Sequence, residues 1–155
     1  MQHLLTAYQQ THYRVQAEPA FTLFIGQASP PLRTWYTLYG VQTAAFITAH
    51  NPFSTLCSAA ANAAAQQQLE THLASLPLHW LPGVGEAPDN HWPAETSCLV
   101  LGMTRQTAET LCQHFQQNAF VFCEQDTVPT LVMVQYPHGQ TVPSPLPSGS
   151  VNHDT

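Results

Sequence analysis

Four clusters of polar residues in this chain carry side chains suited to ligand binding or to acid–base chemistry. The first is the turn His50–Ser54, which follows an apolar stretch ending at Ala49. Ligands gather beyond the ends of buried strands, where a sheet meets the start of a helix. Short polar groups at such a place fix the orientation of a small ligand. We therefore expect His50, Asn51 and Ser54 to line a polar crevice; the alternative is an ordinary Asn-Pro turn.

The other three clusters adjoin predicted helices and strands. Asn62 lies on the inward stripe of a predicted helix, so its amide must be hydrogen-bonded there. Glu95 precedes an apolar strand, where a carboxylate can act as a general base or accept a hydrogen bond from a ligand. Gln117 and Asn118 separate a helix from a strand. Asn118 fits a C-terminal helix cap, or else these two amides turn inward and join the same crevice.

The candidate residues suggest roles for a catalytic or a binding site. If the crevice is catalytic, Glu95 is the general base and His50 the acid or transition-state stabiliser. Because the chain has only three fixed positive charges, Arg14 or Arg33 would have to hold any phosphate, and we take Arg14 as the candidate binding residue. The competing interpretation is structural: Glu95 pairs with Arg14 or Arg33, and the amides brace loops.

No pattern in the sequence indicates a metal or a cofactor. Asp89 and His91 lie near Glu95, but the loop lacks the spacing of a known metal motif. Gly83 and Gly85 do not follow a predicted strand, so they are no nucleotide fingerprint. The cysteines form no Cys-x-x-Cys pair, and we expect all of them to be reduced, buried side chains: Cys57, Cys98, Cys112 and Cys123.

The charge content restricts the classes of partner. The 155 residues include three Arg, no Lys and nine Asp or Glu, giving a net charge of −6 and only 8% charged residues. Such a chain offers no basic patch for a nucleic-acid backbone or for anionic lipid. No apolar run reaches the roughly 18 residues of a membrane span, and the N-terminus lacks a positively charged leader. We therefore expect a cytoplasmic protein.

Hydrophobic periodicity predicts a single α+β domain over residues 1–136. Its central sheet is expected to be mixed and mostly buried, with about five to seven strands and three to four helices packed on it. Residues 76–93 contain four prolines and are predicted to be a loop. Residues 137–155, rich in Pro, Ser and Gly, are predicted to be a disordered tail. Helices are expected near the N-terminus, over 30–39 and 58–75 and after residue 104; strands are expected near 12–17, 21–25, 43–49, 97–102, 119–123 and 130–135.

Several short motifs occur together along the chain: Thr11-x-Tyr13, Ile25-Gly26, the segment Thr48–Ser54, Asn62, Glu95 with Ser97, and Gln117-Asn118-Ala119. This combination resembles an uncharacterised bacterial family, domain of unknown function 3293, over residues 8–133. An acidic residue often precedes the asparagine in the family, whereas this chain has Ala61 before Asn62. The resemblance implies a cytosolic bacterial protein with these polar segments as its signature, and it implies no reaction.

Two functions stay open at this point. In the first, the crevice binds a small polar ligand, nucleotide-like ligands included, and any reaction is a hydrolysis. In the second, the chain is a protein-interaction or regulatory module without catalytic activity, because a surface of low charge is easily desolvated. A homodimer fits either. A single pocket lined by at least three of four residues favours the first: Asn51, Asn62, Glu95 and Asn118.

Overall fold

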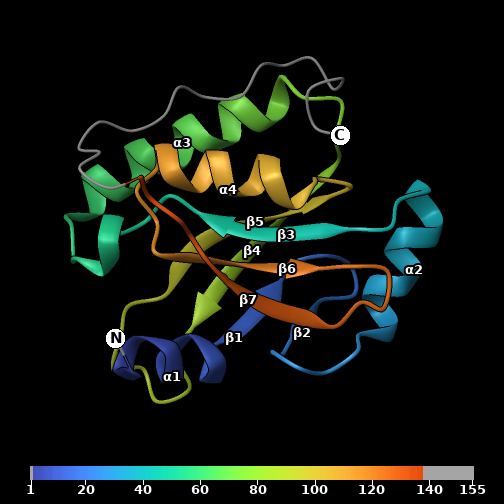
Figure 1. Ribbon diagram of the computed structural model, residues 1–155, viewed down its shortest axis with the longest axis horizontal. Coiled ribbons are helices and arrows are strands. Elements are labelled where there is room, and N and C mark those ends of the chain that lie inside the picture. Colours follow the sequence, from blue (N-terminus) through green and yellow to red (C-terminus); the bar gives the residue numbers. More distant parts are fainter. Residues whose placement is uncertain (1, 138–155) are drawn as a thin grey trace.

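The computed structural model describes residues 2–137, which fold around one seven-stranded sheet (Figure 1). The helices are α1 (Gln2–Gln10), α2 (Pro30–Tyr39), α3 (Ala59–Ala74) and α4 (Arg105–His114), with a short 3-10 turn at Pro52–Ser54. The strands are β1 (His12–Val15), β2 (Phe21–Leu23), β3 (Ala44–Thr48), β4 (Trp80–Glu86), β5 (Glu95–Leu101), β6 (Ala119–Cys123) and β7 (Pro129–Met133). Their order in the sheet is β2-β1-β4-β5-β3-β6-β7. The α+β class is confirmed, although all strand pairs of the described residues are antiparallel rather than mixed.

Strand β4 occupies part of the stretch that the sequence predicts to be a loop. It pairs on one side with β1 and on the other with β5. The carbonyl of Pro82 accepts a hydrogen bond from the Gln16 N–H at 2.8 Å. In an antiparallel strand, the N–H and the C=O of one residue point to the same side, so the nitrogen of Pro82, which carries no hydrogen, also faces β1. It lies beyond Val15, which is the last residue of β1 to pair with β4. The loop prediction is wrong for residues 80–86, because pairing from both neighbours overrides the local turn signals.

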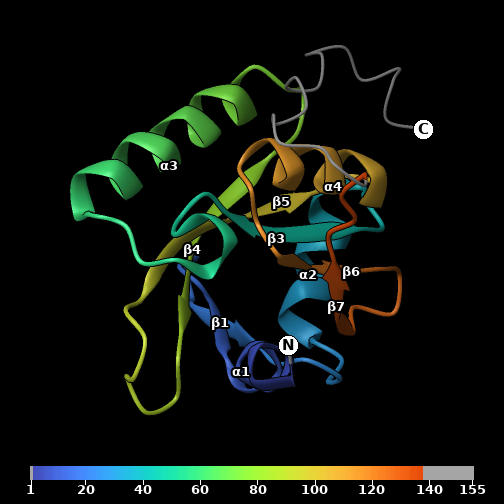
Figure 2. The same cartoon turned by 60° about the vertical axis from the view of Figure 1, so that its left-hand side comes forward.

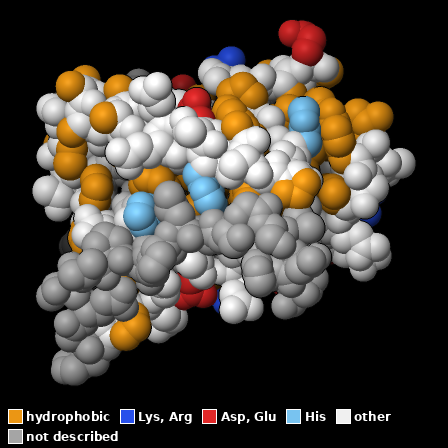
Figure 3. Space-filling model, turned by 90° about the horizontal axis from the view of Figure 1, so that it is seen from above, with side chains coloured by type: hydrophobic (Ala, Val, Ile, Leu, Met, Phe, Trp, Pro, Cys, Tyr) orange, Lys and Arg blue, Asp and Glu red, His pale blue; other side chains and the backbone are white. Residues whose placement is uncertain are grey.

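The sheet curls, and its two faces carry separate hydrophobic cores. Helices α3 and α4 cover the convex face (Figure 1), where Ile47 and Val100 of the sheet pack with Leu69 and Leu111. Figure 2 shows the strands arching from β1 through β4, β5 and β3 to β6 and β7, with α1 across the open side. Seen from the side of α3 and α4, few side chains are charged on the visible part of the surface (Figure 3).

Helix α2 fills one end of the concave face. Its Leu32 and Tyr36 are buried among residues of β2, β5 and β6. The Oγ of Ser29 accepts the Leu32 N–H, and Gly40 ends the helix at a φ of 65°, as the sequence predicts. Tyr39, three residues after Tyr36, does not pack into this core and is 42% exposed. It stacks on the ring of His79 at the surface instead.

The helices predicted over 58–75 and after residue 104 are both present, each beginning at a side-chain cap. Ser58 caps α3, whose buried stripe is Asn62, Gln66, Leu69 and Leu73. Thr104 caps α4. After α4, however, the left-handed residue is Gln116 and not Asn118. Among residues 2–137, no helix combines the length and the apolar character needed to cross a membrane. The predicted tail lies outside the described residues, apart from residue 137.

Candidate functional site

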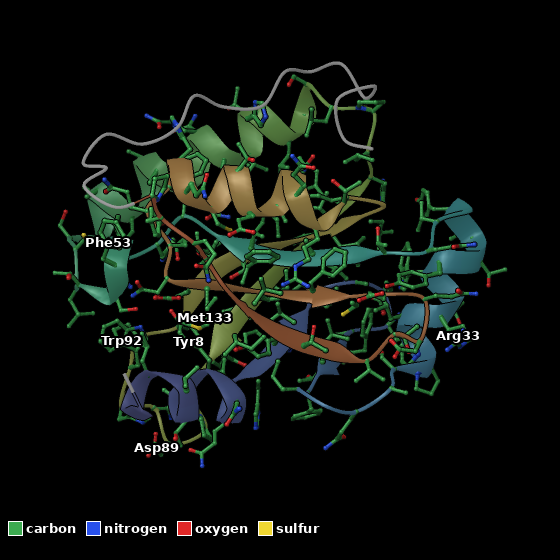
Figure 4. The ribbon with its side chains drawn as sticks, in the orientation of Figure 1. Tyr8, Arg33, Phe53, Asp89, Trp92 and Met133 are labelled. Atoms are coloured by element: carbon green, nitrogen blue, oxygen red, sulfur yellow. The ribbon has the colours of Figure 1, made fainter. Side chains whose placement is uncertain are left out.

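A cavity of about 200 Å³ lies at the other end of the concave face, beneath α1. Figure 4 shows its Tyr8 and Trp92 at one end of the molecule, with Arg33 of α2 at the opposite end. Most of the lining side chains are aromatic or aliphatic. They include Leu4, Tyr8, Tyr13, Phe46, Trp92, Val121 and Leu131. The sequence predicts a polar crevice, whereas this cavity is largely apolar with a few polar groups in its wall.

Two glycines of β4 leave room for the cavity. Gly83 lies opposite Ser97 and Gly85 lies opposite Glu95 in the antiparallel pairing with β5. The ring of Phe46 occupies the space over Gly83, where an added Cβ would come within 2.7 Å of it. An added Cβ at Gly85 would meet only a methyl carbon of Thr11, at 3.8 Å. The space beside Glu95 is therefore open because residue 85 has no side chain.

Strand β5 changes from apolar to polar along the concave face. Its alternate residues Leu101, Leu99 and Ser97 are all buried, and Glu95 follows at the cavity, half-buried. The Oγ of Ser97 donates to the backbone carbonyl of Glu95 at 2.9 Å. The carboxylate thus stands where the core ends and the cavity begins.

The carboxylate of Glu95 is held through one oxygen only. Its Oε2 accepts hydrogen bonds from Asn51 Nδ2 at 2.8 Å and from Trp92 Nε1 at 3.0 Å. Within residues 2–137, no hydrogen bond is made to Oε1 and no ion pair reaches Glu95. Arg14 points away from the cavity between the buried Tyr13 and Val15, so it does not pair with Glu95 or line the cavity.

Asn51 joins Glu95 to helix α3. The Asn51 N–H donates to Asn62 Oδ1 at 2.9 Å, and Asn62 Nδ2 donates to Asn51 Oδ1 at 2.9 Å. The Asn51 Oδ1 also accepts the Cys57 N–H. Asn51 therefore uses its backbone N–H and both ends of its side-chain amide within this network. One chain of hydrogen bonds therefore joins Asn51, Asn62 and Glu95. The predicted single pocket is not found among the described residues, because the cavity is lined by Glu95 alone of the four test residues and a separate groove is lined by Asn51 and Asn62.

Gln117 and Asn118 hold the turn that follows β3. The φ angles of Asn51, Phe53 and Ser54 are 50°, 52° and 57°, a left-handed conformation that is unfavourable for residues other than glycine. Gln117 Nε2 donates to the His50 carbonyl at 3.0 Å, and Asn118 Nδ2 donates to Ser54 Oγ at 2.9 Å. Ser54 and Gln117 also line the cavity.

His50 lies on a different surface from Glu95. It lines an outer groove of about 470 Å³ between α3 and residues 93–96, together with Asn51 and Asn62. Burial lowers the pKa of His50, and the Glu95 carboxylate partly offsets this. No hydrogen bond joins the His50 ring to Glu95 within the described part of the chain. The predicted acid and base thus face the groove and the cavity respectively.

The structure corrects the prediction for one of the four cysteines. Cys57 is exposed in the outer groove rather than buried. The other three cysteines are buried as expected, and burial raises the pKa of Cys123 to about 12.

Tyr8 and Gly85 line the cavity, but neither was given a role from the sequence, because only the curl of the sheet brings α1 over β4. No group of three or more metal-ligating side chains occurs among residues 2–137.

Comparison with known proteins gives a match to one family model over part of the chain, and no reaction. No curated protein and no solved structure matches this chain. The hydrogen-bonded network described above lies within one continuous segment, from the turn after β3 to the start of β6. That segment, residues 47–120, matches the family model described as Protein of unknown function (DUF3293), which confirms the resemblance to that family.

Proposed function

We propose that the protein binds a small amphipathic molecule in the cavity beneath α1. The observation that supports this most is an apolar, aromatic-walled space of about 200 Å³ with one carboxylate oxygen that no described residue bonds. An apolar cavity of about 150 Å³ is large enough to bind benzene. The space beneath α1 accordingly suits one aromatic ring with a short polar substituent.

The apolar and the polar groups of the cavity wall have different roles in binding. Phe46, Val121 and Leu131 supply hydrophobic contact with the body of the ligand. Glu95 supplies a fixed acceptor that orients a hydrogen-bond donor on the ligand. The separation of His50 from Glu95 favours binding over hydrolysis, because an acid and a base must reach the same substrate atoms.

Filling the space next to Glu95 tests this proposal. In Gly85→Val, the new side chain enters the cavity from a position with room for a Cβ. We expect the affinity for 2-phenylethanol, measured by calorimetry, to fall at least about tenfold, while thermal stability stays the same or rises. The control is Val84→Ile, which adds one methylene to the neighbouring residue on the opposite face of β4.

Two results would contradict the proposal. One is a Gly85→Val variant that binds as tightly as the wild type, because the ligand would then lie elsewhere. The other is a wild-type protein that binds no aromatic probe of this size at millimolar concentration, whether the probe is neutral, cationic or anionic.

A further inference from the structure

We propose that the occupant of this cavity is an organic cation: an amine whose protonated nitrogen bonds Glu95 and whose apolar body packs against the aromatic wall. This inference rests on the proposed function and specifies its ligand. It follows from three features of the cavity: an uncompensated negative charge, a carboxylate fixed with one oxygen free, and a wall rich in aromatic rings.

Among the described residues, no arginine pairs with Glu95, and His91, which also lines the cavity, pairs with Asp89 instead. The sequence contains no Lys and only three Arg. Arg14 is exposed on the far side of β1, Arg33 donates to the carbonyl of Asp126, and Arg105 is exposed at the start of α4. The carboxylate therefore attracts a cationic ligand without competition from a positive side chain. It repels an anionic ligand.

The geometry of Glu95 is set before any ligand arrives. Its Oε2 is bonded by both Asn51 and Trp92, and Asn51 is in turn held by two bonds to Asn62. The carboxylate cannot turn its free Oε1 away without breaking these bonds. A ligand ammonium therefore meets an acceptor that is already oriented, and little side-chain entropy is lost on binding.

The aromatic side chains around Glu95 also favour a cation. Tyr8, Tyr13, Phe46 and Trp92 line the same cavity, and the faces of such rings attract ammonium groups. Burial raises the pKa of both tyrosines, so their hydroxyls stay neutral. The Tyr13 hydroxyl donates to the Tyr8 carbonyl and is not available to a ligand as a donor. Glu95 is therefore the charged group that decides which head group is preferred.

Three ligands of matched size test the inference by isothermal titration at pH 7.5. They are 2-phenylethylamine, a cation; 2-phenylethanol, which is neutral; and phenylacetate, an anion. We expect the amine to bind at least about tenfold more tightly than the alcohol, and the anion more weakly than either.

The variant Glu95→Gln tests whether Glu95 causes the preference for the amine. Its amide oxygen can replace Oε2 in accepting from Asn51 and Trp92, so the fold should be retained, which thermal unfolding checks. The amine should then bind no more than about threefold more tightly than the alcohol. The matched control is Glu70→Gln, which removes one negative charge from the outer groove and should leave the preference unchanged.

The outcomes separate this inference from the proposed function. If the three ligands bind equally, or if the preference for the amine persists in Glu95→Gln, the inference is wrong although the cavity binds ligands. If none of the three binds the wild type, the proposed function and the inference both fail.

Discussion

The two ends of the concave face are built from the same strands and differ in what fills them. At the α2 end, Leu32 and Tyr36 pack into a closed core, and the N–H of Gly26, in the turn after β2, donates to the carbonyl of Pro129 in β7. At the α1 end, the strands enclose a cavity beside Gly85 and Glu95. The fold thus provides the concave face, and a few residues at the strand ends determine whether it becomes core or binding site.

The helices that cover the two ends are held differently. Helix α2 has a side-chain cap at its start and a glycine at its end, and its Tyr36 hydroxyl donates to the carbonyls of Cys123 and Glu124. Helix α1 lies across the cavity, where the Tyr13 hydroxyl bonds the Tyr8 carbonyl and the Tyr8 hydroxyl contacts Ser54 Oγ. The polar contacts of α1 therefore involve residues that line the cavity itself.

The cysteines give the largest expected contrast between a closed core and the surface near the site. Cys123 is buried in the core beneath α2, whereas Cys57 is exposed and its N–H bonds Asn51. We expect Cys57 to react with a disulfide reagent in the native protein at least about 1,000-fold faster than Cys123, because Cys123 reacts only after opening of the core. Mass spectrometry of partly labelled protein measures both rates. Comparable rates would show that the α2 end is not closed.

Gly83 and Gly85, two residues apart in β4, test the same difference between the filled and the open part of the concave face. Gly83→Ala should lower the free energy of unfolding by about 2 kcal/mol, because its Cβ would come within 2.7 Å of Phe46 and 3.0 Å of the Arg14 carbonyl oxygen. Gly85→Ala should be neutral or stabilising by about 0.5 kcal/mol, because it enters open space. Urea unfolding of both variants measures the difference. Equal losses would mean that the cavity is filled as tightly as the core.

The parts of this fold that depend on local signals could be predicted from the sequence. Ser29 and Gly40 bound α2 through their own backbone preferences, and the buried stripe of α3 follows from helical spacing alone. Strand β4 could not be found in this way, because Pro82 and its glycines are typical of turns until both neighbouring strands pair with them.

The sequence predicted contacts among the candidate residues better than it predicted the cavity, which is lined by three of the eight candidates: Ser54, Glu95 and Gln117. Asn51, Asn62 and Glu95 were expected together, and the structure joins them by hydrogen bonds. Their spacing in the sequence does not say that Glu95 lines a cavity while Asn51 and Asn62 line a groove on the other side. That division depends on the curl of the sheet, which long-range contacts determine.

The smallest expected effect is on the pH dependence of stability, and it comes from His50 in the outer groove. Burial lowers its pKa from the usual 6.5, so the unfolded chain binds a proton more readily than the folded protein. Its contribution to stability is present above pH 6.5 and is lost as the pH falls through the folded-state pKa. Because the ring is only half-buried, we expect an effect of about a few tenths of a kcal/mol between pH 7.5 and 5.5. His50→Gln should reduce the acid-induced loss by that amount in urea unfolding.

The link between His50 and the cavity can be measured separately. The Glu95 carboxylate raises the pKa of His50, acting against the effect of burial. In Glu95→Gln, this attraction is lost, and the His50 ring should titrate at a lower pH than in the wild type, as followed by NMR. An amine bound at Glu95 should lower the His50 pKa in the same direction, because its positive charge offsets the carboxylate. An unchanged His50 titration with amine bound would place the ligand's charge away from Glu95, and the two surfaces would then be electrostatically independent.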